Sequence, residues 1–373
     1  MSNTFVTPTV VVRDAGIIFM ANAVIPRLIS RDHEAEFVAK KAGSTIKVTY
    51  MTEQTAREFS STTTADNIVE NEVSLVLEKH FYVKHTLTSA ESTYSLDDYS
   101  KKVTGPAIRA LVKAADVYLA QIASEGYARN IVGTEGTAPA TIEDILIGRK
   151  KLQDNLAQTD QPIGLIGTSA EAAFLALTQF TSKDYTRGTS GIEAAQLEKR
   201  FGINWFTDQN CTNHDRGDIA GTVLVDNIAD WQIGDTTVHM DGFTAATGTV
   251  HAGTRFTVAG TATIYTITAD ATLAGNECDV VVTPAMTAIE TDGDAITFKA
   301  AATQDFIYDK RSFIGAIVAP APLKIGSAVS QQNGMGVRVT ESSSTSTLSD
   351  DVVFDILVGA KVMQPNGGVV FQA

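Results

Sequence analysis

The sequence has 373 residues, of which 44% are apolar and 19% are charged, so it can bury a sizeable core and allows about two or three folded units. Its 29 basic and 43 acidic residues give a net charge of −14, which argues against a general nucleic-acid binder and against docking on an anionic membrane. The two cysteines, Cys211 and Cys278, exclude a disulfide framework and a cysteine-cluster metal site. We interpret both as free, buried thiols, although their spacing neither favours nor excludes a single bridge.

The N-terminal segment predicts an extended arm followed by one amphipathic helix. Val10–Val12 is apolar, and the run Gly16–Ile29 approximates a helical stripe that Pro26 interrupts. Such a segment has no core of its own and must pack on the rest of the chain or on a neighbour. Met1–Val12 lacks the features of a signal peptide, so we expect synthesis in the cytosol. No apolar run reaches about 18 residues, so we expect no membrane span.

Residues 41–90 predict a long hairpin. Ser44–Met51 alternates as a strand with Ile46, Val48 and Tyr50 on one side, and Val73–Val83 alternates again after a polar segment of roughly 20 residues. A connection of that length usually means function or mobility. A two-stranded arm is only marginally stable alone, so we expect it to need a surface to lie on.

Residues 96–125 give the strongest helical signal. Ser95 and Asp98 fit a capping box, and apolar residues recur at helical spacing from Ile108 to Ile122. Pro106 either starts the helix or kinks a longer one, which leaves a segment of about 20 residues, roughly 30 Å long. The opposite, polar face is expected to carry Arg109, Lys113 and Asp116.

Residues 141–205 predict an α/β region. Thr141 and Asp144 fit the cap of one helix, and Pro162–Gly167 reads as a short apolar strand. Thr168 and Glu171 are expected to cap a second helix, Ala170–Phe180. A third helix is expected over Gly191–Arg200, with Gly202 as its stop.

Residues 222–300 change in character and predict a small, inserted all-β module. Thr is abundant, Gly recurs, and Arg255–Val258 and Thr261–Thr268 alternate as short strands. The window 226–298 has ten acidic residues, one Arg and no Lys, and so carries most of the chain's negative charge. Larger apolar strands resume after it, with C-terminal strands expected at Met335–Thr340 and Val352–Met363.

The motifs of catalysis are weak. Gly167–Glu171 resembles a nucleophile elbow but lacks the final Gly, so Ser169 is interpreted as a helix-capping residue. We find no phosphate-binding loop, and we interpret Asp292–Asp294 as a turn. We therefore expect no catalytic, cofactor-binding or metal-ligating residue and no cofactor. A structural or solvated role is expected for the six histidines, which are His33, His80, His85, His214, His239 and His251.

Three phrases carry a resemblance to a known family: SLDDYSKKVTGPAIRALVKAADVYLAQIA at 95–123, GINWFTDQN at 202–210 and DFIYDKRSFIGAIVAPAPL at 305–323. In these and in its order of elements, nearly the whole chain resembles the major capsid proteins of tailed bacteriophages, with the HK97-type fold, and within them the coat-protein family of phage P22. The resemblance implies an α+β chain with the following parts: an N-terminal arm at 1–40, an E-loop hairpin with flanking strands at 41–90, the spine helix of the P-domain at 91–129, an A-domain at 130–222 and 303–334, an inserted acidic β domain at 223–302, and C-terminal P-domain strands at 335–373.

The resemblance implies a non-enzymatic shell subunit that assembles into hexameric and pentameric capsomers around double-stranded DNA. Scaffolding and portal proteins, and a decoration protein, are the implied partners; the implied location is the virion, after assembly in the bacterial cytoplasm. Arms that cannot fold alone fit such a role, because neighbouring copies would complete them. The alternatives are an encapsulin-like cargo shell and a hydrolase with a β-rich binding module. Some HK97-type shells crosslink a hairpin Lys to an Asn; Lys47 lies in the hairpin here, but the P22-like group is not expected to crosslink.

Overall fold

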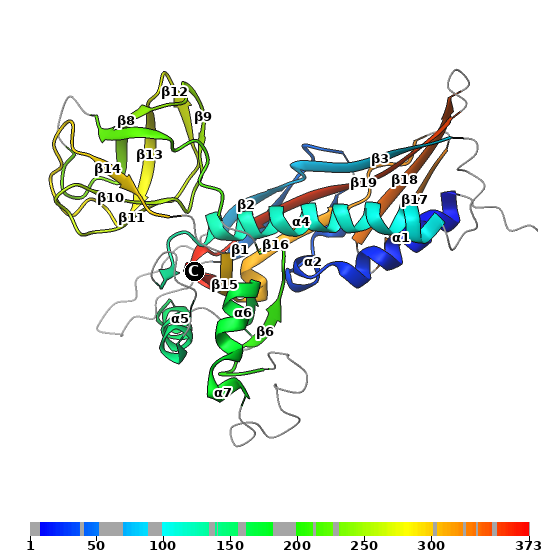
Figure 1. Cartoon of the computed structure of the whole chain (residues 1–373), viewed down its shortest axis with the longest axis horizontal. Helices are drawn as coiled ribbons and strands as arrows, with labels where there is room; N and C mark the ends of the chain where they lie inside the picture. Colours follow the sequence, from blue (N-terminus) through cyan, green and yellow to red (C-terminus); the bar gives the residue numbers. More distant parts are fainter. Residues whose placement is uncertain are drawn as a thin grey trace, which may run out of the picture. The chain divides into compact units, whose positions relative to one another are not determined.

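The computed structural model describes residues 8–37, 41–51, 70–88, 99–133, 139, 141–155, 162–181, 199–211, 214–226, 231–300, 304–323, 326–332, 335–344 and 349–372. Helices and sheets are mixed along the chain, which confirms the expected α+β class (Figure 1). The chain divides into a first unit, Met1–Ala115 with Ile314–Met363, and a second unit, Asp116–Phe313 with Gln364–Ala373. Among the described residues, no helix is both long enough and apolar enough to cross a membrane.

A long sheet forms the centre of the first unit. Its order is β16-β19-β18-β17, and β3 also pairs with β19. The strands are β3 Lys79–Thr88, β16 Phe313–Val318, β17 Ser327–Gln332, β18 Met335–Ser344 and β19 Ser349–Val362. The two predicted C-terminal strands are confirmed, and β19 starts three residues earlier than expected. Because side chains alternate along a strand, Val339, Phe354 and Ile356 are buried on one face while their neighbours turn to the other.

The N-terminal segment is more helical than its sequence indicated. α1 spans Pro8–Asn22, α2 spans Ile25–Leu28, and a 3-10 turn spans Glu34–Glu36. The expectation of an extended arm at residues 10–12 was wrong, because Pro8 has a φ suited to a first helical turn and the following apolar residues form a buried stripe. That stripe consists of Val11, Val12, Ala15 and Phe19, and α1 packs on β17 and β18. Pro26 lies in the first turn of α2 and separates the two helices, as expected.

The longest helix begins with a π-helical turn, Ser100–Thr104, and continues as α4, Gly105–Gly126. Its 22 residues agree with the expected length, and Pro106 sits in its first turn. The predicted apolar stripe is confirmed by the burial of Ile108, Leu111, Val112, Ala115 and Leu119. The prediction for the polar face was wrong at Asp116, which is fully buried and accepts a hydrogen bond from Asn210 Nδ2 (3.1 Å). The predicted cap at Ser95 and Asp98 lies outside the described residues.

The hairpin strands are β1, Thr45–Met51, and β2, Glu70–Val76, which pair antiparallel in a two-stranded sheet and confirm the predicted hairpin. The expectation of one strand over Val73–Val83 was wrong, because the chain changes partner between β2 and β3: β2 pairs with β1, whereas β3 pairs with β19. Gly359 of β19 allows the close approach at this point, since a Cβ there would lie 2.0 Å from the Val76 carbonyl oxygen.

The second unit contains a mixed sheet in the order β4-β20-β15-β5-β6. β5 is parallel to β6 and β4 is parallel to β20, whereas β15 is antiparallel to both of its neighbours. The strands are β4 Ile131–Val132, β5 Ile163–Ile166, β6 Asn204–Thr207, β15 Gln304–Tyr308 and β20 Gly368–Gln372. The short apolar strand predicted at 162–167 is confirmed by β5. Ile166, Trp205, Ile307 and Phe371 are core residues here.

Three helices of the second unit were predicted with mixed success. α5, Ile142–Asp154, has the expected capping box, in which the Asp144 N–H donates to the Thr141 hydroxyl (3.2 Å). The single helix expected at 170–180 is two, α6 Thr168–Leu175 and α7 Thr178–Thr181. Thr168 is not the cap; Gly167 is, and its N–H donates to the Asp305 carboxylate (2.5 Å) from β15. The helix expected at 191–200 falls almost wholly outside the described residues.

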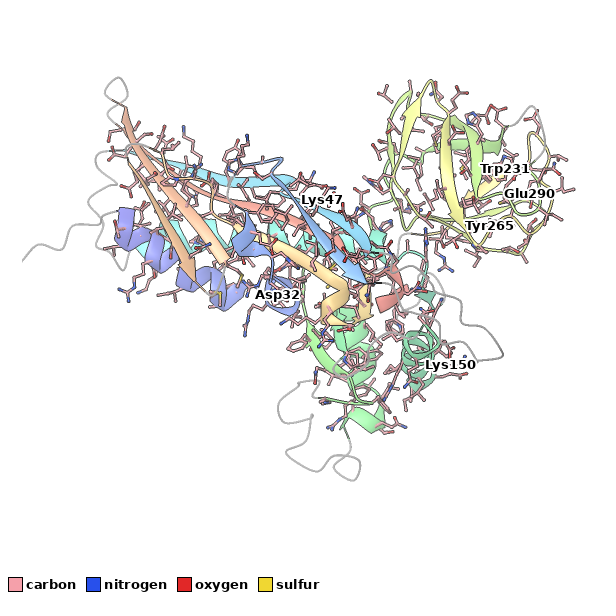
Figure 2. All side chains as sticks on the ribbon, turned by 180° about the vertical axis from the view of Figure 1, so that it is seen from behind. Asp32, Lys47, Lys150, Trp231, Tyr265 and Glu290 are labelled. Carbon is pink, nitrogen blue, oxygen red and sulfur yellow. The ribbon has the colours of Figure 1, made fainter. Side chains whose placement is uncertain are left out.

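Residues 221–298 form a β module with its own core. A six-stranded antiparallel sheet runs in the order β14-β10-β11-β13-β8-β7. A bridge between Leu224 and Ala295 joins its two ends, so the sheet closes into a barrel. Trp231, Tyr265 and Glu290 lie in this module (Figure 2), and Trp231 is fully buried. The strands are β7 Gly221–Val225, β8 Thr237–Phe243, β9 Thr247–Val250, β10 Arg255–Val258, β11 Tyr265–Ile267, β12 Ala271–Ala274, β13 Cys278–Thr283 and β14 Ile296–Phe298, with β9 pairing β12.

Candidate assembly surfaces

The β1–β2 hairpin has one apolar and one polar face. The register pairs Ile46 with Leu75 and Val48 with Val73, so these side chains and Tyr50 share a face. Val48 and Leu75 are buried, and they pack with residues of β16 and β19. Tyr50 and Val73, farther along the hairpin, are only half-buried. The first unit therefore covers the apolar face near the base of the hairpin and leaves it partly open farther out.

The other face of the hairpin is charged. Lys47 Nζ donates to Glu72 Oε2 at 2.6 Å, and both side chains are more than half exposed (Figure 2 shows Lys47). The hydrogen bond and the charge of Glu72 raise the pKa of Lys47. A lysine amine is nucleophilic only when deprotonated, so this pairing disfavours covalent chemistry at Lys47.

A largely buried polar network lies on the face of the long sheet opposite Phe354 and Ile356. Arg338 of β18 and Asp355 of β19 are directly paired, and Arg338 Nε and Nη2 both donate to the Asp355 carboxylate, Nε at 3.0 Å. His80 Nε2 of β3 lies 2.9 Å from the same carboxylate. Asp355 is 2% exposed. Buried charges need such bidentate and additional partners, so this network fixes the register of three strands.

Farther along the same face, the polar contacts become solvent-exposed. Asp351 accepts from Lys84 Nζ at 2.8 Å and from Thr86 Oγ1 at 2.6 Å. These bonds lower the pKa of Asp351, with that from Lys84 the largest cause. Between the two charge clusters, Tyr82 is 67% exposed. The sequence signalled alternation in these strands but gave no sign of the pairing, because His80 and Asp355 are 275 positions apart.

The residues considered for catalysis are not brought together. Ser169 lies exposed in the first turn of α6, just after β5, and it is not the cap of that helix, which is Gly167. Among the described residues, five histidines have other partners and the sixth, His85, has a buried Nε2 without a hydrogen bond. The partners of the five are Glu36 for His33, Asp355 for His80, Ser124 for His214, Asp279 for His239 and Asp270 for His251.

Both cysteines are free and buried, as expected from the sequence. Burial, and then the negative charge of Asp208, Asp305 and Asp116, raises the pKa of the Cys211 thiol well above its usual range. Burial and Asp279 raise the pKa of the Cys278 thiol to about 11. Because the thiolate is the nucleophile and the metal ligand, we expect both thiols to stay protonated and unreactive at neutral pH.

Comparison with known proteins identifies the fold. No family model matches the sequence, and no curated protein does. Among solved structures, one from Mycobacterium phage Che8 covers 94% of this chain and 90% of its own at 14% identity and a TM-score of 0.52. The capsid structure of cyanophage P-SCSP1u covers 94% of this chain and 88% of its own at 10% identity and a TM-score of 0.50. The chain has the HK97-type capsid fold, as its resemblance implied.

Proposed function

We propose that this chain is the major capsid protein of a tailed phage, which self-assembles into the icosahedral shell around the double-stranded DNA genome and has no catalytic role. The observation that carries the proposal is the likeness to the P-SCSP1u capsid structure over 94% of the chain. The half-open apolar face of the β1–β2 hairpin supports it, because a neighbouring copy can cover what the chain's own residues leave exposed.

We assign the parts of the chain as the HK97-type fold implies. The long sheet and α4 support a P-domain, and the mixed sheet of the second unit supports an A-domain. The assignment is an N-terminal arm at 1–40, an E-loop hairpin and flanking strands at 41–90, a P-domain spine helix at 91–129, an A-domain at 130–222 with its return at 303–334, an inserted β domain at 223–302 and P-domain C-terminal strands at 335–373. Membership of the P22 coat-protein group remains a prediction.

The proposal includes partners and a location. Identical chains would form hexameric and pentameric capsomers, in which weak contacts gain strength by repetition around a closed lattice. A scaffolding protein and a portal would act during assembly in the bacterial cytoplasm, and a decoration protein is a further candidate partner. The net charge of −14 argues that DNA is enclosed without specific binding. The mature location would be the virion.

A pair of hairpin variants tests the proposal. Tyr50→Asp places a charge on the half-open apolar face, whereas Thr49→Asp places the same charge on the neighbouring, exposed position of the polar face. We expect the wild type and Thr49→Asp to form closed particles in negative-stain microscopy, and Tyr50→Asp to remain as folded, unassembled subunits. Circular dichroism of the soluble fraction checks folding.

Two results would count against the proposal. One is a monodisperse wild-type monomer under every assembly condition, including co-expression with a scaffolding partner. The other is particle formation by Tyr50→Asp equal to that of Thr49→Asp, which would show that the hairpin face has no role between subunits. Particles that form in the bacterium around a protein cargo instead of DNA would support the encapsulin-like alternative.

A further inference from the structure

The outer face of the β module brings one histidine and several carboxylates together on three adjacent strands. The register pairs His239 of β8 with Asp279 of β13. On the other side of β8, Asp226 directly follows β7, and its backbone N–H donates to the His239 carbonyl (3.3 Å). Glu277 precedes β13 by one residue. His239 and Asp279 are paired strand residues, and Asp226 and Glu277 lie at the ends of the two strands that flank β8, so the sheet brings the four residues side by side.

The two ring nitrogens of His239 face different surroundings. Nδ1 lies 2.7 Å from Asp279 Oδ1, and because an ionised carboxylate only accepts, Nδ1 carries the proton of this bond. Nε2 lies 3.6 Å from both Asp226 Oδ2 and Glu277 Oε2, which is beyond hydrogen-bond distance. The three ligand atoms all lie within 4.8 Å of one another. A ring lone pair that faces two negative oxygens is unfavourable, and either a proton on Nε2 or a metal cation between the three ligand atoms relieves the repulsion.

The spacing matches the coordination sphere of a small metal ion. Ligands at about 2.0–2.1 Å around a tetrahedral zinc ion are roughly 3.4 Å apart. The distances from His239 Nε2 to the two carboxylate oxygens, 3.6 Å each, are close to this ligand–ligand distance. They are longer than the distance between adjacent ligands of an octahedral site with the same bond length, which is about 3.0 Å. An imidazole among the ligands favours zinc and similar transition metals over calcium or magnesium, which prefer all-oxygen sites. The contact of Nδ1 with Asp279 is the carboxylate–histidine–metal arrangement that orients such ligands.

The electrostatics of the module agree with this geometry. The window 226–298 has ten acidic residues against a single Arg, so local cations are scarce. The surface is thus one that favours a positive charge.

We propose that Asp226, His239 and Glu277 bind a divalent zinc-class ion, with Asp279 as the positioning residue for the ring and water in the remaining position. Such an ion joins β7, β8 and the start of β13 on the outside of the barrel and neutralises part of the acidic module. The site lies wholly within residues 226–279, so it holds whether or not the chain forms a capsid.

The test uses the full chain, stripped of metal with a chelator, and Co²⁺ as a spectroscopic probe. We expect one Co²⁺ per chain with the intense visible bands of tetrahedral coordination, displaced by one equivalent of Zn²⁺. His239→Gln should abolish the bands, and Asp279→Asn should weaken Zn²⁺ binding about 10- to 100-fold in calorimetry. His33→Gln is the matched control, because His33 also has a carboxylate on Nδ1, that of Glu36 at 2.7 Å, and should bind metal as the wild type does.

Several outcomes would overturn the proposal. Absence of tetrahedral bands in the wild type would show that His239 is a protonated imidazolium held by carboxylates. Bands that persist in His239→Gln would place the metal elsewhere, and an unchanged affinity in Asp279→Asn would remove the positioning role. Tryptophan fluorescence, to which Trp231 contributes from the core of the same module, reports whether each variant is folded. Should His239→Gln fail to fold, Glu277→Gln, at a half-exposed position, must lose the bands instead.

Discussion

Removal of the Asp355 carboxylate should strongly destabilise the first unit. In Asp355→Ala, Arg338 loses both of its bonds to the acid and is left 12% exposed without a counter-charge. Breaking a buried pair by removing one partner costs about 3–5 kcal/mol. Arg338 keeps its bond to the Ala321 carbonyl (2.6 Å), and His80 is 41% exposed and can hydrate, so we expect the lower end, about 3 kcal/mol. At about 2–4 °C per kcal/mol for a unit of this size, the apparent Tm falls by about 6–12 °C.

The assay is thermal unfolding of unassembled subunits followed by far-ultraviolet circular dichroism. Asp351→Ala is the matched control, because Asp351 lies on the same strand and face but its ion pair with Lys84 is exposed to solvent, where such pairs contribute little. Trp205 and Trp231 both belong to the second unit, so their fluorescence follows that unit separately. Equal Tm values for Asp355→Ala and Asp351→Ala would refute the reasoning.

Exchange of both charged partners for apolar residues provides a further check. The double variant Arg338→Met with Asp355→Leu removes the unpaired charge along with its partner. Because apolar replacement of a buried ion pair is often neutral or stabilising, it should be more stable than either single variant. A double variant no more stable than Asp355→Ala would mean that the loss came from packing and not from charge.

Three other predictions follow from buried groups. Gly359→Ala should lower stability by about 1–3 kcal/mol in denaturant titration, because its Cβ would meet the Val76 carbonyl oxygen, and a wild-type midpoint would contradict this. Cys211 and Cys278 should resist a thiol reagent at pH 8 until guanidinium unfolds the chain, since burial raises the pKa of both; labelling of the native chain would count against their burial. Burial lowers the pKa of His214 to about 4 in the folded chain. Between about pH 6.5 and pH 4 the unfolded chain is therefore protonated at His214 while the folded chain is not, so the free energy of unfolding falls by about 3 kcal/mol as the pH drops through this range. In denaturant titrations followed by tryptophan fluorescence, the free energy of unfolding of His214→Gln should depend less on pH than that of the wild type. An unchanged pH dependence would exclude His214 as the cause.

Elements with a strong local signal could be predicted from the sequence. α4 and α5 carry apolar residues at helical spacing, and α5 has its cap at Thr141, so both were placed within a few residues. β1 and β10 alternate cleanly between turn residues and were also found. These features depend on neighbours within one or two turns of the chain, which periodicity detects directly.

Features that depend on distant partners could not be predicted. The break between β2 and β3 has no Gly or Pro to mark it; it arises because β3 finds its partner in β19. Asp116 sits at a polar position of the helical repeat, yet Asn210 from a distant turn makes its burial tolerable. The cluster around His239 was interpreted as a set of separate residues, because only the pairing of β8 with β7 on one side and β13 on the other places Asp226 and Glu277 beside it. In each case the decisive contact is set by tertiary pairing.

The closure of the barrel by β7 and β14 also brings the first and last strands of the β module together. Leu224 and Ala295 form an antiparallel bridge, and Val225 donates its N–H to the Asp294 carbonyl at 2.9 Å. Outside them, Arg216 Nη1 donates to the Lys299 carbonyl at 2.6 Å, so the two flanking segments are also joined. The first and last strands of the module thus lie next to each other where Leu224 and Ala295 bridge. A gene segment encoding such a module can be gained, lost or exchanged for a foreign domain with a junction of a few residues, which makes this position a natural graft point for displayed sequences.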